Sequence, residues 1–129
     1  MNLTPLEEAH WVYTHREEYD RQQRYDAAVS LSQWGRFSLR QVAAICGIAH
    51  STVKVVAGSK SEKTGGRFNP ACLPILIDIR GRRVRGEAVD ADTVRRLVST
   101  GTSLGFAARL SEIPESYLRR RLERSEEAA

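Results

Sequence analysis

The chain has 129 residues, of which 41% are hydrophobic and 28% charged, and its formal net charge is +4. That length supports one globular domain or two very small ones. We expect neither a membrane span nor a signal peptide. No apolar run approaches the roughly 18 residues of a span, and Glu7 and Glu8 stand where a signal peptide is basic and then apolar. We therefore expect a cytoplasmic protein.

The positive charge is concentrated in the middle of the chain. Residues 1–37 carry four basic and six acidic side chains, residues 38–86 carry nine and two, and residues 87–129 carry seven and eight. A basic segment of this kind is typical of proteins that bind a polyanion.

The first part of the chain predicts two helices. Thr4, Pro5 and Glu7 form a helix start with a capping box. Apolar residues at helical spacing continue to about Trp34, and the polar stretch 20–24 separates an acidic first helix from a second one that runs from Tyr25 and ends at Gly35.

The stretch from Leu39 to Gly58 predicts two short helices that meet at a steep angle. Ala43 is small where the helices cross, and Gly47 supplies a left-handed turn. The positions expected to be buried are Val42, Cys46, Ile48, Val53 and Val56, and those left outward on the second helix are His50, Ser51, Lys54 and Val55.

This pattern resembles the helix-turn-helix family of DNA-binding proteins, with the small alanine, the turn glycine and the five apolar positions all present. The resemblance implies that the second helix enters the major groove and places its N-terminal side chains against base edges. The residues expected to contact DNA there are His50, Ser51, Thr52 and Lys54. The alternative is a helical hairpin without a DNA role, because hairpins with glycine turns occur elsewhere.

We interpret residues 59–86 as a basic linker. Its first part, to Asn69, has the composition of a loop, in which Lys60, Lys63 and Arg67 are expected to contact the DNA backbone. The apolar run from Pro70 to Ile79 is compatible with either a helix or a strand.

The run from Arg80 to Gly86 resembles the core of AT-hook segments, in which extended Arg-Gly-Arg lies in a narrow minor groove. The residues that this resemblance assigns to DNA are Arg80, Arg82, Arg83 and Arg85. The alternative is a solvated turn with scattered charges.

Residues 87–129 repeat the helix-turn-helix pattern. A capped helix from Asp90 to Gly101 is followed by residues that align with positions 38–53 at a constant offset of 65. Glu112 replaces the turn glycine and Arg121 replaces the last apolar residue. The outward positions, which we assign to DNA contact, are Glu115, Ser116, Arg119 and Arg120. The alternative is a structural bundle that braces the first one.

The expected fold is mainly all-α, with a first helix-turn-helix domain over 1–58, a basic linker over 59–86 and a second helix-turn-helix-like domain over 87–129. We find no paired acid and base, nucleophile motif or metal-ligand spacing, so we expect a non-enzymatic protein without a metal or cofactor. The expected partner is double-stranded DNA, with no membrane and no small-molecule ligand.

The two unequal units resemble the immunity repressors of actinobacterial phages. That resemblance implies a transcriptional repressor in the host bacterial cytoplasm, bound as a monomer to an asymmetric operator. Two alternatives stay open at this point. One is the bipartite DNA-binding module of a recombinase or transposase, and the other is a phage assembly protein such as a small terminase subunit.

Overall fold

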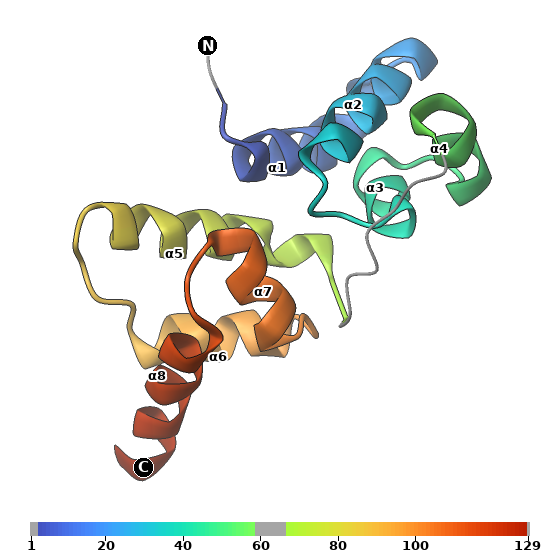
Figure 1. Ribbon diagram of the computed structural model, residues 1–129. Helices are drawn as coiled ribbons and strands as arrows, with labels where there is room; N and C mark the ends of the chain where they lie inside the picture. The colour runs from blue at the N-terminus through green and yellow to red at the C-terminus, as the bar shows by residue number, and fades with distance from the viewer. Residues whose placement is uncertain (1–2, 59–66, 129) are drawn as a thin grey trace. The chain divides into compact units, whose positions relative to one another are not determined.

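The computed structural model is all-helical, as expected, and describes residues 3–58 and 67–128 (Figure 1). No β-strand occurs within those two ranges. The chain divides into unit 1, residues 1–64, and unit 2, residues 65–129. Unit 1 contains α1 (Pro5–His15), the 3-10 helix η1 (Arg16–Glu18), α2 (Arg21–Trp34), α3 (Leu39–Cys46) and α4 (His50–Ala57). Unit 2 contains the 3-10 helix η2 (Pro70–Cys72), α5 (Leu73–Val84), α6 (Ala91–Ser99), α7 (Leu104–Ser111) and α8 (Glu115–Ala128).

Reciprocal side-chain caps begin α1, α2 and α3 of unit 1. The Thr4 hydroxyl accepts the Glu7 N–H at 3.2 Å, and the Glu7 carboxylate accepts the Thr4 N–H at 3.1 Å. Asp20 and Gln23 form the same pair before α2. Because this capping box satisfies two N–H groups, α2 begins at Arg21 and not at Tyr25 as the sequence predicted.

The core of unit 1 lies where its four α-helices meet. Helices α2, α3 and α4 pack on one another, and α1 packs on α2 and α3. The side chains that are at most 1% exposed include Leu6, Leu31, Val42, Ile45, Cys46 and Val53. Burial of each aliphatic side chain stabilises the unit by about 1.5–3 kcal/mol. Val53 is the one fully buried residue of α4, so it anchors this helix to the core.

The predicted linker is wrong for most of its length, because residues 70–84 form η2 and α5 within unit 2. The apolar run that the sequence left open between helix and strand is helical. Leu73, Leu76 and Ile79 are all 0% exposed, and their spacing places them on one stripe that α6 and α7 cover. This burial makes α5 part of the second core.

The sequence repeat extends to whole units. Helix α5 packs on α6 and α7, as α1 packs on α2 and α3. Ser38 and Ser103, which are 65 residues apart, cap α3 and α7 by accepting the N–H of the third helical residue. The residues just before them, Phe37 and Thr102, are both buried. Each unit therefore carries a final helix pair supported by two earlier helices.

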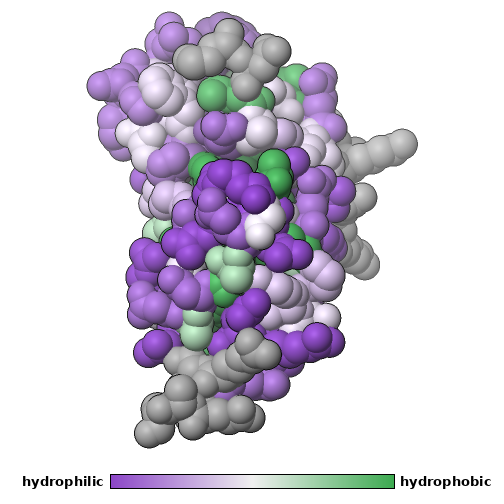
Figure 2. Space-filling model, turned by 90° about the vertical axis from the view of Figure 1, so that its left-hand side faces the viewer, coloured by the Kyte–Doolittle hydropathy of each residue, from purple (hydrophilic) through white to green (hydrophobic). Residues whose placement is uncertain are grey.

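Hydrophilic residues cover most of the face drawn in Figure 2. On the face drawn in Figure 2, hydrophobic residues form small patches among hydrophilic ones. Among the large hydrophobic side chains of the described residues, the exposed ones are Leu3, Trp11, Val55, Val84 and Val98. Val55 is the most exposed of these, at 84%, and it belongs to the helix that the sequence assigns to DNA.

Candidate nucleic-acid interface

The turn between α3 and α4 has the left-handed geometry that the sequence predicted. Gly47 has φ +70°, and the N–H groups of Gly47 and Ile48 both donate to the Ala43 carbonyl, at 2.9 and 3.2 Å. Ala43 itself is 8% exposed. Because glycine adopts this backbone conformation without a steric penalty, the chain reverses within three residues and α4 begins at His50.

Two arginines hold this turn from outside. Arg16 donates from Nη1 to the Ala44 carbonyl at 2.9 Å, and Arg24 donates from Nη1 to the Gly47 carbonyl at 3.0 Å. These bonds satisfy acceptors at the C-terminal end of α3 that have no partner within the helix. Both arginines therefore fix the start of α4 relative to α1 and α2.

The outward face of α4 consists of His50, Ser51, Lys54 and Val55, which are all exposed as the sequence predicted. The opposite side carries the buried Val53. Ile48 and Val56, which were expected to be buried, are half-buried and lie at the margin of the core. No residue of α4 is acidic, so its outward face presents one cation, two polar groups and one aliphatic group.

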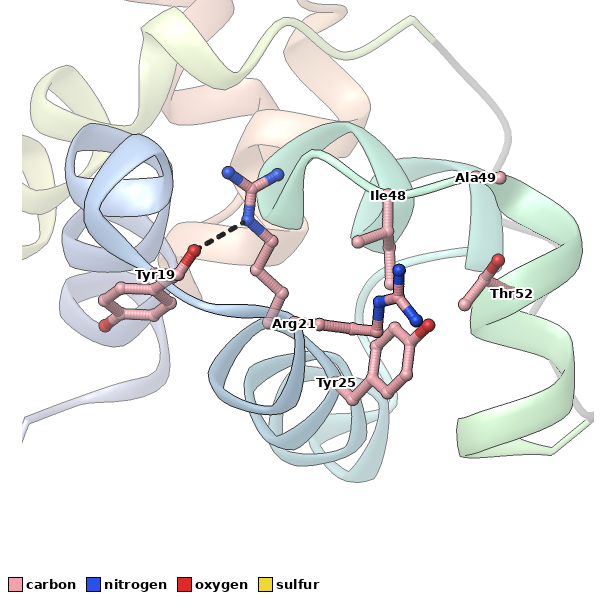
Figure 3. A pocket seen from close by; sticks show the side chains of 7 residues that line it. Tyr19, Arg21, Tyr25, Ile48, Ala49 and Thr52 are labelled. Carbon is pink, nitrogen blue, oxygen red and sulfur yellow. Dashed lines mark hydrogen bonds between the residues drawn. The ribbon is translucent and has the colours of Figure 1, made fainter.

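An open pocket of about 350 Å³ lies beside α4, bordered by Thr52 and by the N-terminal part of α2 (Figure 3). The Arg24 Nε donates to the Tyr19 carbonyl on one wall, at 3.4 Å. Figure 3 shows Arg21, Tyr25 and Thr52 around the same space. The residues that line it are Tyr19, Arg21, Arg24, Tyr25, Ile48, Ala49 and Thr52.

Thr52 is the one lining residue that the sequence assigned to DNA contact, and Arg21, Arg24 and Tyr25 were not predicted. The one usable signal in the sequence is a pair of arginines one helical turn apart directly after the Asp20 cap. That signal does not show which helix they face, because three of their neighbours in the pocket, Ile48, Ala49 and Thr52, lie more than twenty residues further along the chain.

The second helix pair has the same turn with a different residue. Glu112 adopts φ +60°, and the Ile113 N–H donates to the Ala108 carbonyl at 3.1 Å, as Ile48 does to Ala43. The Glu112 carboxylate lies 3.0 Å from Arg80 Nη2. This ion pair offsets part of the steric cost of a left-handed residue other than glycine.

The outward residues of α8 are exposed, but two of them pair with each other. Arg119 Nη2 lies 2.6 Å from the Glu115 carboxylate, and this pairing raises the pKa of Arg119. Ser116 and Arg120 are exposed and have no polar partner among the described residues. The α8 face thus offers fewer free groups than the sequence suggested.

The backbone of the AT-hook-like segment is helical and not extended, so the predicted conformation is wrong. Helix α5 continues to Val84, since Leu76 and Ile79 are buried on it and Asp78 pairs with Arg82 one turn later at 3.2 Å. All four guanidinium groups are engaged within unit 2. Arg80 contacts Glu112, Arg82 contacts Asp78 and Asp90, Arg83 lies over the Tyr117 ring, and Arg85 contacts Glu87.

Tyr117 joins several elements of unit 2. The guanidinium carbons of Arg83 and Arg121 lie 4.5 and 5.1 Å from its ring centroid, and its hydroxyl accepts the Val89 N–H at 3.1 Å. Burial raises the pKa of the Tyr117 phenol, but the Val89 N–H and the two arginines outweigh this effect and lower it. Arg121, which departs from the apolar pattern, is therefore used to cover an aromatic ring.

Three predicted DNA contacts remain, namely Lys60, Lys63 and Arg67. Lys60 and Lys63 lie outside the described residues. Arg67 is exposed, while its backbone carbonyl accepts the Ser103 N–H at 2.9 Å. The Arg67 side chain has no polar partner among the described residues, and its backbone is held at the start of α7.

The cysteines and other candidate metal ligands do not gather into a site within the described ranges. Cys46 and Cys72 are free and fully buried, and burial raises the pKa of their thiols to about 12 and about 11. Among the residues that the structure describes, no group of three or more His, Cys, Asp or Glu side chains is placed to hold a metal ion. No helix in these ranges has the length and apolar character needed to cross a membrane.

The features that bear on function are thus the outward face of α4, the pocket beside it and the second, internally paired helix α8. Neither the protein-family models, nor the curated proteins, nor the solved structures include a match to this chain.

Proposed function

We propose that this chain is a sequence-specific double-stranded DNA-binding protein, in which α4 inserts into the major groove. The observation that carries the proposal is the exposure of His50, Ser51 and Lys54 on a helix whose other side is anchored by Val53. An α-helix with its side chains is about 10–12 Å in diameter, which suits a major groove about 12 Å wide.

The side chains on this face have the chemistry that base recognition needs. Ser51 and His50 exchange hydrogen bonds with base edges, and Lys54 donates to guanine O6 and N7 or to a phosphate. With Arg16 and Arg24 hydrogen-bonded to the turn, α4 is preorganised, so binding does not have to order it. A preorganised helix with exposed polar side chains favours DNA recognition over the alternative of a helical hairpin without a DNA role.

Unit 2 has a different part in this proposal. On its helix α8, Ser116 and Arg120 are exposed and have no polar partner among the described residues, while Glu115 and Arg119 form an ion pair. We propose that α8 makes a second, weaker contact on the same duplex. Because the outward residues of α4 and α8 differ, one chain would occupy one non-palindromic site.

The regulatory role follows from occupancy. A small chain that covers a promoter site excludes polymerase, so we propose that it is a transcriptional repressor, as the resemblance to phage immunity repressors implies.

The test begins with selection of bound sequences from random duplex DNA. The double variant Ser51→Ala, Lys54→Ala should then bind the selected site at least tenfold more weakly, since each lost base contact costs about 1–3 kcal/mol. The matched control is Arg95→Ala, Ser99→Ala, which removes one cation and one hydroxyl from exposed positions of α6. Equal affinity of the α4 variant and the wild type, with both folded, would refute the proposal.

Stoichiometry tests the arrangement on DNA. Light scattering of the complex on a single selected site should give the mass of one chain per duplex, and the site should lack inverted symmetry. Two chains on a symmetric site would refute monomeric binding and give unit 2 a bracing or dimerising role.

A further inference from the structure

The pocket beside α4 gathers polar groups that the fold does not use. Arg21 is exposed, and Tyr25 and Thr52 are half-buried. Within the described residues, none of these three side chains makes a hydrogen bond or an ion pair. Figure 3 shows them around one open space, with Arg21 and Tyr25 on α2 and Thr52 on α4. Three unused groups from two helices are available to one ligand.

The charge of the pocket selects an anion. Its lining includes two arginines and no carboxylate. The nearest acidic side chains along α2 are engaged elsewhere, since Asp20 accepts the Gln23 N–H and Asp26 accepts from the Gln22 amide. A guanidinium with two hydroxyl groups matches an anion with several oxygens, and a phosphate has this arrangement.

Unit 2 provides an internal comparison. The residue 65 positions after Thr52 is Tyr117. Its ring lies against Arg83 and Arg121, and its hydroxyl accepts the Val89 N–H. The position of unit 2 that is equivalent to Thr52 thus holds an aromatic side chain whose ring and hydroxyl already have partners. Unit 1 has the short Thr52 hydroxyl at this position, and Arg21 in the same pocket has no hydrogen-bond or ion-pair partner among the described residues.

We infer that this pocket binds a phosphate group and that, on the proposed function, this is a DNA backbone phosphate next to the bases contacted by α4. Thr52 follows Ser51 directly, so it borders the outward face of the helix. Arg21 supplies the charge, and the Tyr25 and Thr52 hydroxyls donate to phosphate oxygens. The contact fixes the position of α4 along the groove without itself specifying a base.

The experiment measures binding of the full chain to its selected duplex with single phosphates replaced, one at a time, by neutral methylphosphonates. One replacement should weaken the wild type about tenfold, the scale of one charge-assisted hydrogen bond. Arg21→Ala should bind the unmodified duplex about tenfold more weakly than the wild type does. Replacing that same phosphate should then weaken the variant no further. Its dependence on salt should also fall by about one released counterion.

Two further variants sharpen the result. Tyr25→Phe, which removes only a hydroxyl, should show part of the Arg21→Ala loss at the same phosphate. Arg95→Ala, an exposed arginine of α6 near Asp92, should leave the methylphosphonate pattern unchanged. If Arg21→Ala and the wild type respond equally to every methylphosphonate and share one salt slope, the inference is overturned.

Failure of the proposed function would give a different pattern. If no duplex binds the wild type specifically, inorganic phosphate is titrated into the protein while the backbone signals of residues 21, 25 and 52 are followed by NMR. Saturable shifts that Arg21→Ala abolishes would support a phosphate site that serves a free ligand. The absence of such shifts would overturn the phosphate site itself.

Discussion

Replacement of Gly47 by alanine should destabilise unit 1 by about 2 kcal/mol. The left-handed backbone at φ +70° costs a residue with a Cβ about 1–2 kcal/mol. The new Cβ would lie 3.2 Å from both Arg16 Cδ and Arg24 Nη1, so it displaces side chains whose hydrogen bonds are each worth about 0.5–1.5 kcal/mol. The reduced freedom of the unfolded chain returns about 0.4–1 kcal/mol.

Urea unfolding followed by tryptophan fluorescence measures this effect. Both tryptophans, Trp11 and Trp34, lie in unit 1, so the transition reports that unit. Glu112→Gly is the matched change at the equivalent turn of unit 2, followed by circular dichroism. This change relieves the left-handed strain, but it removes the ion pair with Arg80 and raises the conformational entropy of the unfolded chain. The free energy of unfolding of unit 2 should therefore change by less than about 0.5 kcal/mol. A loss below about 0.5 kcal/mol in Gly47→Ala would refute the reasoning.

Three other predictions follow. If the Val55 methyl groups contact the methyl group of a thymine, Val55→Ala should weaken DNA binding about fourfold, as measured by fluorescence anisotropy. On the same duplex with that thymine replaced by deoxyuridine, the variant should lose no affinity. Equal losses on the two duplexes would contradict the contact. The Thr93 hydroxyl and N–H hold the pKa of Asp90 below its usual range. The stability that these bonds give is therefore complete above the ordinary carboxyl pKa of about 3.9 and is lost as the pH falls through the lower pKa of the folded state. Asp90→Asn should reduce this acid-induced loss of stability in urea titrations, and an unchanged pH profile would count against the cap. Because burial raises the pKa of Cys46 to about 12 and of Cys72 to about 11, iodoacetamide should label both thiols only after unfolding, and rapid native labelling detected by mass spectrometry would contradict their burial.

Local chemistry was sufficient to predict the helix pairs. A small alanine and a turn glycine act over fewer than ten positions, so their effect can be recognised in the sequence. The predicted outward positions on α4 are exposed for the same reason, since helical periodicity alone places them opposite Val53.

Local patterns failed for residues 70–86. An apolar run followed by arginines and glycine is compatible with a helix, a strand or an extended arm, and isolated propensities do not decide among them. Burial of Leu73, Leu76 and Ile79 against α6 and α7 favours the helix. The Asp78–Arg82 pair then carries it through Gly81.

The sequence by itself determined a mainly helical chain, the capped helix starts at Thr4 and Asp90, the turn at Gly47 and the polar face of α4. Only the tertiary structure decided that α5 belongs to a second core and that its arginines are engaged there. It alone brought Arg21 and Tyr25 beside Thr52. The physical reason is that periodicity and caps depend on near neighbours, whereas a pocket and an ion pair depend on groups that folding brings together from distant parts of the chain.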